Sequence, residues 1–336
     1  MKNCLLLLAM VALSFALTGL IRRYALARSL FDVPNSRSSH TLPTARGGGL
    51  AIVITVFIAL TGASRWDQVS AALVSSFVFA GGLTALIGFL DDHGHIAPKW
   101  RLLVHFVCAA IALMCLGGLG PLVIGSITLE PTELRICLGL LFLVWMINLY
   151  NFMDGIDGLA SVEAITCCVS ASILFAVTGH VQLLAGPLLL ASAVLGFLIW
   201  NFPPAKIFMG DAGSGFLGLA IGVLAVQSSW VDPAFFWAWC ILLGVFVVDA
   251  TYTLIRRGLR GARVYEAHRS HAYQFASRRA GAHWPVTVAV ALINIFWLLP
   301  LAAAVVLMQL NGIAGVLIAY IPLLVLAICY RAGCEE

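Results

Sequence analysis

Two adjacent carboxylates end an apolar segment of the sequence. Asp91 and Asp92 close the run LIGFLDD, directly before the polar stretch HGHIAPKWR. Like charges so close together repel each other, and they become favourable when a cation or a metal-bound phosphate lies between them. The pair therefore points to phosphate chemistry supported by a divalent cation, although a solvated helix end would give the same pattern.

A second group of oxygen ligands leaves an apolar segment in NLYNFMDGIDGLA. Its members lie three residues apart and are Asn148, Asn151, Asp154 and Asp157. Residues three apart share one face of a helix. No Lys or Arg lies between Asn148 and Glu163, and uncompensated acid at a membrane edge is costly. We therefore expect a hard divalent cation to bind here, with an N-cap and loop cluster as the alternative.

A glycine-rich turn in NFPPAKIFMGDAGSGFLG gives the third candidate. Pro203 and Pro204 end the preceding helix, and the glycines open the next one. A helix that begins in such a turn offers free N–H donors to an anion. Asp211 in the turn could hold a metal that bridges to a phosphate, Phe208 could stack on a base, and Asn201 frames the turn.

Two basic segments add candidates for phosphate contact. The first loop, DVPNSRSSHTLPTARGGG, and the last long loop, EAHRSHAYQFASRR, each hold three of them: Arg37, His40, Arg46, His268, Arg269 and His271. His105, Glu163 and Asp249 lie in or near apolar runs. Nothing in the sequence pairs Glu163 and Asp249, so both are interpreted as helix-packing or supporting groups.

Apolar sequence separates these segments. Of the 336 residues, 62% are hydrophobic and 10% are charged, and the mean hydropathy is +1.02. Soluble chains are about 45–50% apolar and about 25% charged, which excludes a soluble, disordered, collagen-like or disulfide-scaffold protein. The net charge of +4 is too weak and dispersed to indicate a nucleic-acid partner. The nine cysteines form no CxxC pair and are interpreted as small buried hydrophobes.

Eleven apolar runs are candidates for membrane spans of about 20 residues. They cover 3–21, 48–63, 69–90, 102–117, 136–150, 159–178, 181–199, 214–230, 235–255, 286–306 and 312–330. The sequence therefore predicts an all-α polytopic membrane protein with about 10–11 transmembrane helices, formed by one domain over 1–336. The segment 117–135 is predicted as a turn or a small hairpin.

The distribution of basic residues predicts the orientation of the chain. Alternate loops place sixteen of the 19 Lys and Arg residues on one side and three on the other. The basic side faces the cytoplasm, which puts the N-terminus outside, the C-terminus inside and every candidate group on cytoplasmic loops. Arg22 and Arg23 follow the first apolar run, so we expect a retained helix there and not a signal peptide.

These stretches resemble the polyprenyl-phosphate N-acetylhexosamine-1-phosphate transferases (glycosyltransferase 4, MraY/WecA-like). The likeness runs in the order of the family from Asp32 to Gln274 and is carried by DVPNSRSSHTLPTARGGGLA, GFLDD, NLYNFMDGIDGLA, NFPPAKIFMGDAGSGFLG and AHRSHAYQ. It is greatest to the WecA and WbpL types, which start O-antigen or related polysaccharides. The resemblance implies a multi-pass enzyme of the bacterial inner membrane that moves a sugar 1-phosphate from a UDP-N-acetylhexosamine to undecaprenyl phosphate and releases UMP.

The resemblance also implies roles for single residues. Asn151 and Asp211 match the metal positions, for a required Mg2+ that Mn2+ could replace. The catalytic candidates are the aspartates of the two acidic motifs: Asp91, Asp92, Asp154 and Asp157. The substrate-binding candidates are Arg37, His40, Arg46, Lys99, Asn148, Asn201, Phe208, Gly210, His268, Arg269 and His271. Lys99 or Arg101 matches a basic phosphate-binding position.

One loop departs from the family pattern. Tyr273 and Gln274 stand where many members carry further histidines, in a loop associated with sugar recognition. The sugar is therefore left open between GlcNAc and a 6-deoxy sugar such as FucNAc or QuiNAc. The alternatives are the phospho-MurNAc-pentapeptide transferase of peptidoglycan synthesis and, in a different class, a transporter or flippase of lipid-linked sugars, which one-sided polar groups disfavour. A homodimer is also left open.

The acceptor itself indicates how the reaction proceeds. A phosphate monoester has a second pKa of about 6, so it is mostly a dianion at neutral pH and scarcely requires a general base. The acidic motifs contain no Cys, Ser or Lys that could act as an activated nucleophile. We therefore expect direct attack by the lipid phosphate, with an aspartyl-phosphate intermediate as the alternative.

Overall fold

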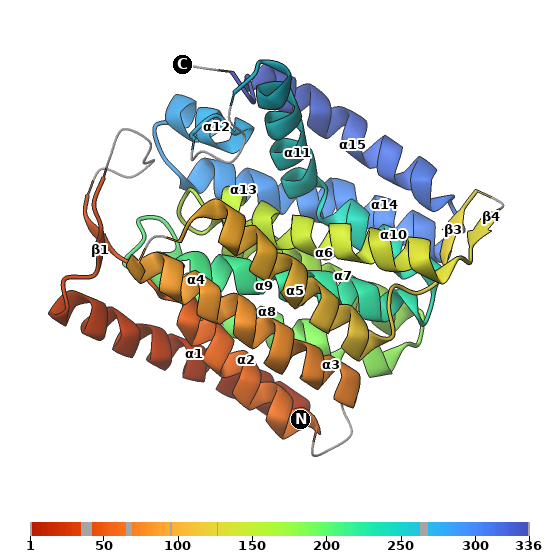
Figure 1. The fold of residues 1–336 in the computed structure, drawn as a ribbon, viewed down its shortest axis with the longest axis horizontal. Helices are drawn as coiled ribbons and strands as arrows, with labels where there is room; N and C mark the ends of the chain where they lie inside the picture. The colour runs from red at the N-terminus through yellow and green to blue at the C-terminus, as the bar shows by residue number, and fades with distance from the viewer. Residues whose placement is uncertain are drawn as a thin grey trace.

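Helices that run between two ends of the molecule make up almost all of the fold (Figure 1). The computed structural model describes residues 2–34, 42–64, 69–94, 96–125, 127–262 and 268–334. The α-helices are α1 (Lys2–Ala27), α2 (Gly49–Ser64), α3 (Ala71–Ser75), α4 (Gly82–Gly94), α5 (Pro98–Leu116), α6 (Thr132–Met153), α7 (Leu159–Val177), α8 (Ala185–Asn201), α9 (Asp211–Ser229), α10 (Pro233–Leu242), α11 (Gly244–Leu259), α12 (Ala272–Ala280), α13 (Trp284–Ile293), α14 (Leu299–Leu307) and α15 (Gly312–Cys329).

Short irregular helices and two small hairpins complete the secondary structure. The π-helical turns η1 (Ser76–Gly81) and η3 (Asn294–Leu298) lie inside longer helical rods, and η2 (Val181–Leu183) is a 3-10 turn. β1 (Phe31–Asp32) pairs with β2 (Thr44–Ala45), and β3 (Leu122–Ile124) pairs with β4 (Ile127–Leu129), both antiparallel. The second hairpin confirms the one predicted within 117–135.

The apolar runs of the sequence are helical in the structure. Over the residues that the structure describes, nine helices are long and apolar enough to cross a membrane, or ten if the bent pair α10–α11 is one span. The pair bends by 68°, and α2 is apolar over Gly49–Ala63 but shorter than the others. The chain is therefore an all-α, multi-pass membrane protein, as predicted; which end faces the cytoplasm stays a prediction.

Helix α9 is the centre of the bundle. Ninety-four per cent of its apolar window is buried inside the protein, against 17–61% for the other spans. Glycines allow the neighbouring helices to approach this closely. A Cβ at Gly218 would lie 2.2 Å from the carbonyl oxygen of Met146 on α6, and one at Gly88 on α4 would lie 2.4 Å from the carbonyl oxygen of Asp211. The second contact fixes the end of α4 against the start of α9.

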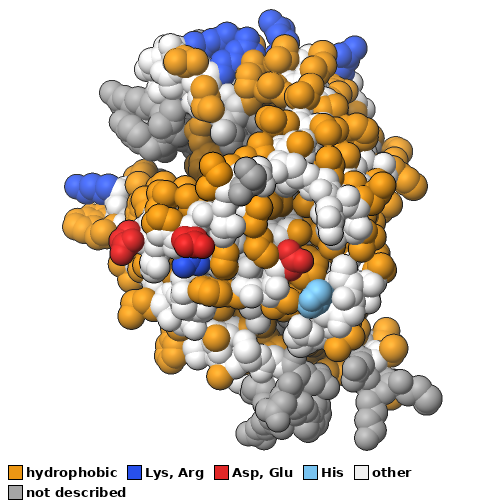
Figure 2. Space-filling view, turned by 90° about the vertical axis from the view of Figure 1, so that its right-hand side faces the viewer, with side chains coloured by type: hydrophobic (Ala, Val, Ile, Leu, Met, Phe, Trp, Pro, Cys, Tyr) orange, Lys and Arg blue, Asp and Glu red, His pale blue; other side chains and the backbone are white. Residues whose placement is uncertain are grey.

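The two ends of the bundle differ in polarity. The β1–β2 hairpin and α12 lie at one end, and the β3–β4 hairpin lies at the other (Figure 1). Figure 2 looks onto the β3–β4 end, whose surface is mostly hydrophobic and uncharged, with few acidic side chains, while Lys and Arg gather at its upper edge. The candidate motifs of the sequence belong to the β1–β2 end.

Candidate active site

Three aspartates from two helices meet where α4 touches α9. Asp91 and Asp92 lie in the last turn of α4, and Asp211 is the first residue of α9. The Asp92 carboxylate accepts hydrogen bonds from the backbone N–H groups of Asp211 (3.0 Å) and Ala212 (3.4 Å). The sequence predicted an anion site at this helix start. In the structure the chain's own Asp92 carboxylate occupies it.

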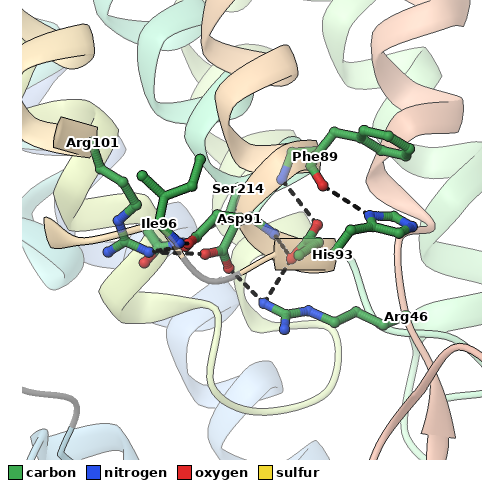
Figure 3. A network of polar contacts seen from close by, with 11 residues as sticks. Arg46, Phe89, Asp91, His93, Ile96, Arg101 and Ser214 are labelled. Atoms are coloured by element: carbon green, nitrogen blue, oxygen red, sulfur yellow. Dashed lines mark hydrogen bonds and ion pairs between the residues drawn. The ribbon is translucent and has the colours of Figure 1, made fainter.

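Two arginines hold this carboxylate cluster from opposite sides (Figure 3). Arg46 Nη2 lies 2.8 Å from Asp92 Oδ1 and 2.7 Å from Asp211 Oδ1. Arg101 Nη1 forms an ion pair with Asp91 and lies 3.2 Å from Asp211 Oδ2. Asp211 therefore links the two arginines. Figure 3 also shows the backbone of Ile96, whose N–H group donates to Asp91 Oδ1 at 2.6 Å.

Backbone pairing delivers Arg46 to the cluster. The segment that follows β2 runs beside the glycine-rich turn: Phe208 N–H donates to the carbonyl of Ala45 at 2.8 Å, and Gly48 N–H donates back to Phe208 at 2.9 Å. Burial alone would lower the pKa of the Arg46 guanidinium. The carboxylates of Asp211 and Asp92 outweigh that effect and raise the pKa above its usual value, so Arg46 stays charged.

Asp154 stands beside the cluster without a partner of its own. Within the described residues its carboxyl makes no hydrogen bond or ion pair, and it lies just past the end of α6. Burial raises the pKa of this carboxyl well above its usual value, and the negative charges of Asp211 and Asp92 add to the rise. Asn151, one turn earlier, donates its amide to Ser214 Oγ at 3.2 Å, which joins α6 to α9.

A small cavity lies between these groups. Its volume is about 20 Å3, enough for one water molecule or small ion, and its polar lining includes Asp91, Arg101, His105, Asn151 and Asp211. His105 is 8% exposed, and its Nδ1 has no hydrogen-bond partner. Sequence reasoning left His105 unplaced. Its spacing of four residues from Arg101 was the available signal, because that spacing puts both on one face of α5.

The residue types around the cavity fit a hard divalent cation. With all four ionised, Asp91, Asp92, Asp154 and Asp211 outnumber Arg46 and Arg101 by two negative charges. Carboxylate and amide oxygens are the ligands that Mg2+ prefers. In the described part of the chain no three His, Cys, Asp or Glu side chains are grouped as a metal site, and the arginines hold oxygens of the clustered carboxylates. Asn151 and Asp211 are the donors that would hold the ion.

A larger cavity of about 530 Å3 has Phe208, from the turn that leads to Asp211, in its wall, but none of the clustered arginines or aspartates lines it. Asp157 and Phe208 line it together with His283 and Trp284 at the start of α13. Asp157 is separate from the aspartate cluster: its Oδ2 accepts the N–H of Ala205 at 3.0 Å, and its Oδ1 lies 3.2 Å from His283 Nδ1. The structure thus separates the predicted acidic pair, because Asp157 lines this larger cavity and Asp154 does not.

Two predicted substrate-binding amides serve the scaffold in this arrangement. Asn201 is buried, accepts the N–H of Gly158 at 3.0 Å and donates to the carbonyl of Ile207 at 3.0 Å, so it joins two loops. Asn148 donates to the carbonyl of Val144 in its own helix at 2.7 Å. Their contact with a substrate stays a prediction.

Gly210 directly precedes α9, and its contact with a substrate stays a prediction. It has a φ of +79°, and a Cβ there would lie 2.7 Å from Asp92 Oδ2. Lys99 and Arg101, which the sequence left as alternatives, separate clearly. Arg101 reaches the cluster, whereas Lys99 is exposed with its Nζ 5.6 Å from the ring centre of Trp100.

The last loop is organised by a buried aspartate. Asp249 Oδ1 lies 3.2 Å from His271 Nδ1, and the Asp249 carboxylate caps the start of α12 by accepting two backbone N–H groups at 2.9 and 3.0 Å. His271 stacks on His268 with ring centres 4.9 Å apart. Burial lowers the pKa of His268 to about 3, and His271 adds to the decrease, so His268 is neutral. Arg269 follows it, and its carbonyl accepts from Arg278.

Tyr273 supports the acidic loop, and Gln274 caps the start of α12. Tyr273 Oη donates to the carbonyl of Phe152 at 2.9 Å, and a Cβ at Gly155 would overlap this hydroxyl. Gln274 is buried and accepts the N–H of His271 at 3.2 Å. Both side chains therefore hold backbone in place. Arg37 and His40 lie outside the described residues.

Comparisons with known proteins identify the family of the chain. Residues 73–229 match the sequence model of glycosyl transferase family 4, which spans α3 to α9 and includes the three clustered aspartates. A protein of Bacillus subtilis, a probable undecaprenyl-phosphate N-acetylglucosaminyl 1-phosphate transferase, is 30% identical over 264 residues, which cover 76% of this chain and 72% of the relative. The chain belongs to glycosyl transferase family 4. This confirms the resemblance and makes this family 4 member an enzyme, a glycosyl-1-phosphate transferase.

Two further relatives show the breadth of family 4. A decaprenyl-phosphate N-acetylglucosaminephosphotransferase of Mycolicibacterium smegmatis is 34% identical over 250 residues, or 66% of this chain and 60% of the relative. The chain thus spans about three fifths of that relative's length. A phospho-N-acetylmuramoyl-pentapeptide-transferase of Lactococcus lactis is 25% identical over 299 residues, or 83% of this chain and 87% of the relative.

Proposed function

We propose that this enzyme transfers an N-acetylhexosamine 1-phosphate from a UDP-sugar to undecaprenyl phosphate and releases UMP. The sugar is GlcNAc or a 6-deoxy sugar such as FucNAc or QuiNAc. The reaction would be the first membrane step of an O-antigen or related envelope polysaccharide, at the inner membrane of a bacterium. The Bacillus and Mycolicibacterium relatives, whose names give a polyprenyl phosphate and N-acetylglucosamine, support this choice.

One observation carries the proposal. Arg46 and Arg101, from distant parts of the chain, converge with Asp91, Asp92 and Asp211, and the turn that leads to Asp211 places Phe208 in the wall of a 530 Å3 cavity. A planar guanidinium is suited to bind phosphate oxygens with two parallel hydrogen bonds. The two guanidinium groups can thus bind a diphosphate once a cation offsets the excess negative charge of the aspartates, and the cavity with Phe208 in its wall has room for a nucleoside.

The chemistry follows from the acceptor. An oxygen of the lipid phosphate attacks the sugar-bearing phosphorus, a new P–O bond forms, and the bond from that phosphorus to the bridging oxygen of UMP breaks. UMP leaves with the electron pair. Such transfers depend on positioning and charge neutralisation more than on covalent catalysis. Arg46 and Arg101 supply that neutralisation by exchanging carboxylate oxygens for oxygens of the diphosphate.

We propose Mg2+ as the cofactor, with Asn151 and Asp211 as its ligands and Mn2+ as a substitute. When bound, it would neutralise the diphosphate and lower the barrier to phosphoryl transfer. The excess negative charge around Asp154 supports this choice. Exhaustive chelation should abolish UMP release, and added Mg2+ should restore it; activity that survives chelation would remove the metal from the proposal.

A panel of donors tests the proposed function. The enzyme purified in detergent is given undecaprenyl phosphate and, in turn, UDP-GlcNAc, UDP-GalNAc, UDP-FucNAc, UDP-QuiNAc and UDP-MurNAc-pentapeptide, and UMP is measured. UMP should form with an N-acetylhexosamine donor and only when the lipid is present. A preference for the pentapeptide donor would instead assign the chain the activity of the Lactococcus enzyme. The absence of any UMP would favour a transporter of lipid-linked sugars.

A further inference from the structure

Two acidic side chains are buried in the helical bundle away from the aspartate cluster, Asp249 on α11 and Glu163 on α7. Asp249 is surrounded by donors. Two backbone N–H groups of α12, the hydroxyl of Thr253 at 3.1 Å and the ring of His271 at 3.2 Å all point to its carboxylate. Hydrogen bonds of this number stabilise the charged form of a carboxylate.

Glu163 lies in a different environment. It is 0% exposed, and its Oε2 accepts one hydrogen bond, from Asn294 Nδ2 at 2.7 Å. Its Oε1 has no partner within the described residues, and neither does Asn294 Oδ1, although Asn294 is also 0% exposed. Two buried acceptors are thus left without a donor, although buried polar groups in native proteins are nearly always hydrogen-bonded.

No positive charge compensates Glu163 either. Among the described residues Glu163 forms no ion pair, and the helical rod that carries Asn294, residues 284–307, contains no Asp, Glu, Lys or Arg. The titratable side chains that interact with Glu163 are Cys167 on its own helix, Tyr150 on α6 and Tyr320 on α15. Cysteine and tyrosine are ordinarily uncharged at neutral pH. An ionised Glu163 would therefore be a charge without a counterion.

A single proton resolves all of these observations. A carboxylate only accepts hydrogen bonds, whereas a protonated carboxyl also donates one. We propose that Glu163 is a proton-binding site, with the proton on Oε1 and the carboxyl paired to the Asn294 amide by two complementary hydrogen bonds. The amide N–H donates to Oε2, and the new O–H donates to Asn294 Oδ1. The proton comes from water, and the buried carboxylate becomes a neutral acid.

The pair lies where it can hold two functional helices together. Asn294 begins the π-helical turn η3, and π turns are frequent at functional positions. The rod with Asn294 also contacts the loop just before α7, nearer the large cavity, where Thr287 Oγ1 donates to the carbonyl of Asp157 at 2.9 Å. The bound proton therefore acts as a structural ligand that keeps α13, with its cavity-lining His283 and Trp284, against α7.

Infrared spectroscopy tests the proton directly. The full-length protein in detergent at neutral pH is compared with its Glu163→Gln variant, in H2O and in D2O. The wild type should show the carbonyl stretch of a protonated carboxyl, which shifts in D2O and is missing from the variant. Glu133→Gln, at an exposed position at the start of α6, is the matched control and should remove only carboxylate bands. A wild type that gives carboxylate bands for Glu163 overturns the proposal.

Thermal stability gives an independent test. The amide in Glu163→Gln keeps the same pairing as the protonated acid, so this variant should melt like the wild type at low pH, whereas Glu163→Leu should melt several degrees lower. In the unfolded chain Glu163 ionises near its usual value of about 4.3, so above that pH wild-type folding takes up a proton. As the pH rises further, the folding equilibrium constant of the wild type should therefore fall about tenfold per pH unit relative to that of Glu163→Gln.

The stability test has results that would overturn the proposal. If Glu163→Gln fails to fold, or melts as low as Glu163→Leu, the site needs a charge and the proposal is wrong. If wild type and Glu163→Gln depend on pH in the same way, no proton is bound there. A double variant, Glu163→Gln with Asn294→Asp, exchanges acid and amide; it should fold and regain the infrared band of a protonated carboxyl, and its failure to do so would also overturn the pairing.

Discussion

Asp211 is the residue on which the whole cluster depends. Its two carboxylate oxygens form ion pairs with Arg46 and Arg101, one each, and its backbone N–H donates a hydrogen bond to Asp92. Arg46 and Asp211 are 165 residues apart in sequence, so no spacing rule could pair them. The sequence predicted the members of this cluster, but their partners come only from the fold.

Loss of the Asp211 charge should remove most of the activity. We expect Asp211→Asn to lower UMP release by more than about a hundredfold, which corresponds to about 2.7 kcal/mol of transition-state stabilisation. The amide cannot hold both arginines or a divalent cation with the same charge. Activity and the melting curve are measured together, with Glu133→Gln as the control at an exposed acid. A folded variant with near-normal turnover would contradict the assignment.

The choice between Lys99 and Arg101 can be decided in the same assay. Arg101 contacts two carboxylates of the cluster, whereas Lys99 is exposed over Trp100. Arg101→Ala should therefore reduce turnover by about a hundredfold, comparable to the loss of other charged groups that stabilise a transition state. Lys99→Ala should change it by less than about threefold, as expected for an exposed side chain. The reverse order would place Lys99 on the substrate.

At the scale of elements, the packing of α4 against α9 sets the geometry of the site. A Cβ at Gly88 would lie 2.4 Å from the carbonyl oxygen of Asp211 and 2.5 Å from the backbone nitrogen of Ala212. Overpacking of this kind typically costs about 1–3 kcal/mol. The close approach is therefore the feature that brings the two ends of the acidic cluster together.

A matched pair of glycine variants tests this contact. Gly88→Ala should push α4 from α9, lower the melting temperature and reduce UMP release, because Asp91 and Asp92 move away from Asp211. Gly94→Ala, six residues later on the same helix, meets no atom within 4 Å of its new Cβ and should leave both properties unchanged. Equal behaviour of the two variants would show that the α4–α9 contact does not position the site.

The last loop shows contacts that the sequence could not predict. Tyr273 and Gln274 depart from the family pattern and were interpreted as a sign of altered sugar choice. In the structure both are buried and bound to backbone: Tyr273 supports the acidic loop, and Gln274 caps the start of its own helix, while their part in sugar choice stays a prediction. Sequence patterns report which residue type occupies a position, and burial decides whether that residue can reach a ligand.

Donor choice in a Tyr273 variant checks this conclusion. Tyr273→Phe removes the hydrogen bond to the carbonyl of Phe152, which should cost about 1 kcal/mol of stability and a modest part of the turnover. The ranking of UDP-sugars in the donor panel should not change, because the Tyr273 hydroxyl is hydrogen-bonded to a backbone carbonyl and not to the sugar. A variant that prefers a different sugar would place Tyr273 in the sugar site.

At the scale of the whole molecule, much of the fold was predictable. The eleven apolar runs became helices, and the candidate motifs gathered at one end, since hydropathy and charge are averages over many residues. The 68° bend between α10 and α11 was not visible, because residues 235–255 form one continuous apolar run. The two irregular turns η1 and η3 were hidden inside uniform runs for the same reason.

The orientation of the bundle is open to a direct experiment. In a cysteine-free background, Glu130→Cys on the β3–β4 side should react with a membrane-impermeant thiol reagent that is added to spheroplasts. Arg278→Cys on α12 should react only after the membrane is permeabilised. Both positions are exposed, so access depends on the side of the membrane alone. Labelling in the opposite order would invert the predicted topology.

The carboxylate of Asp92 at the start of α9 has a consequence for selectivity. In the free enzyme Arg46, Arg101 and the N–H groups at the start of α9 are already bound to carboxylates of the chain itself. A lone inorganic phosphate gains little by displacing one of these contacts. A ligand that brings two linked phosphates and its own counterion can displace several at once, so we expect the enzyme to favour such a ligand over simple anions.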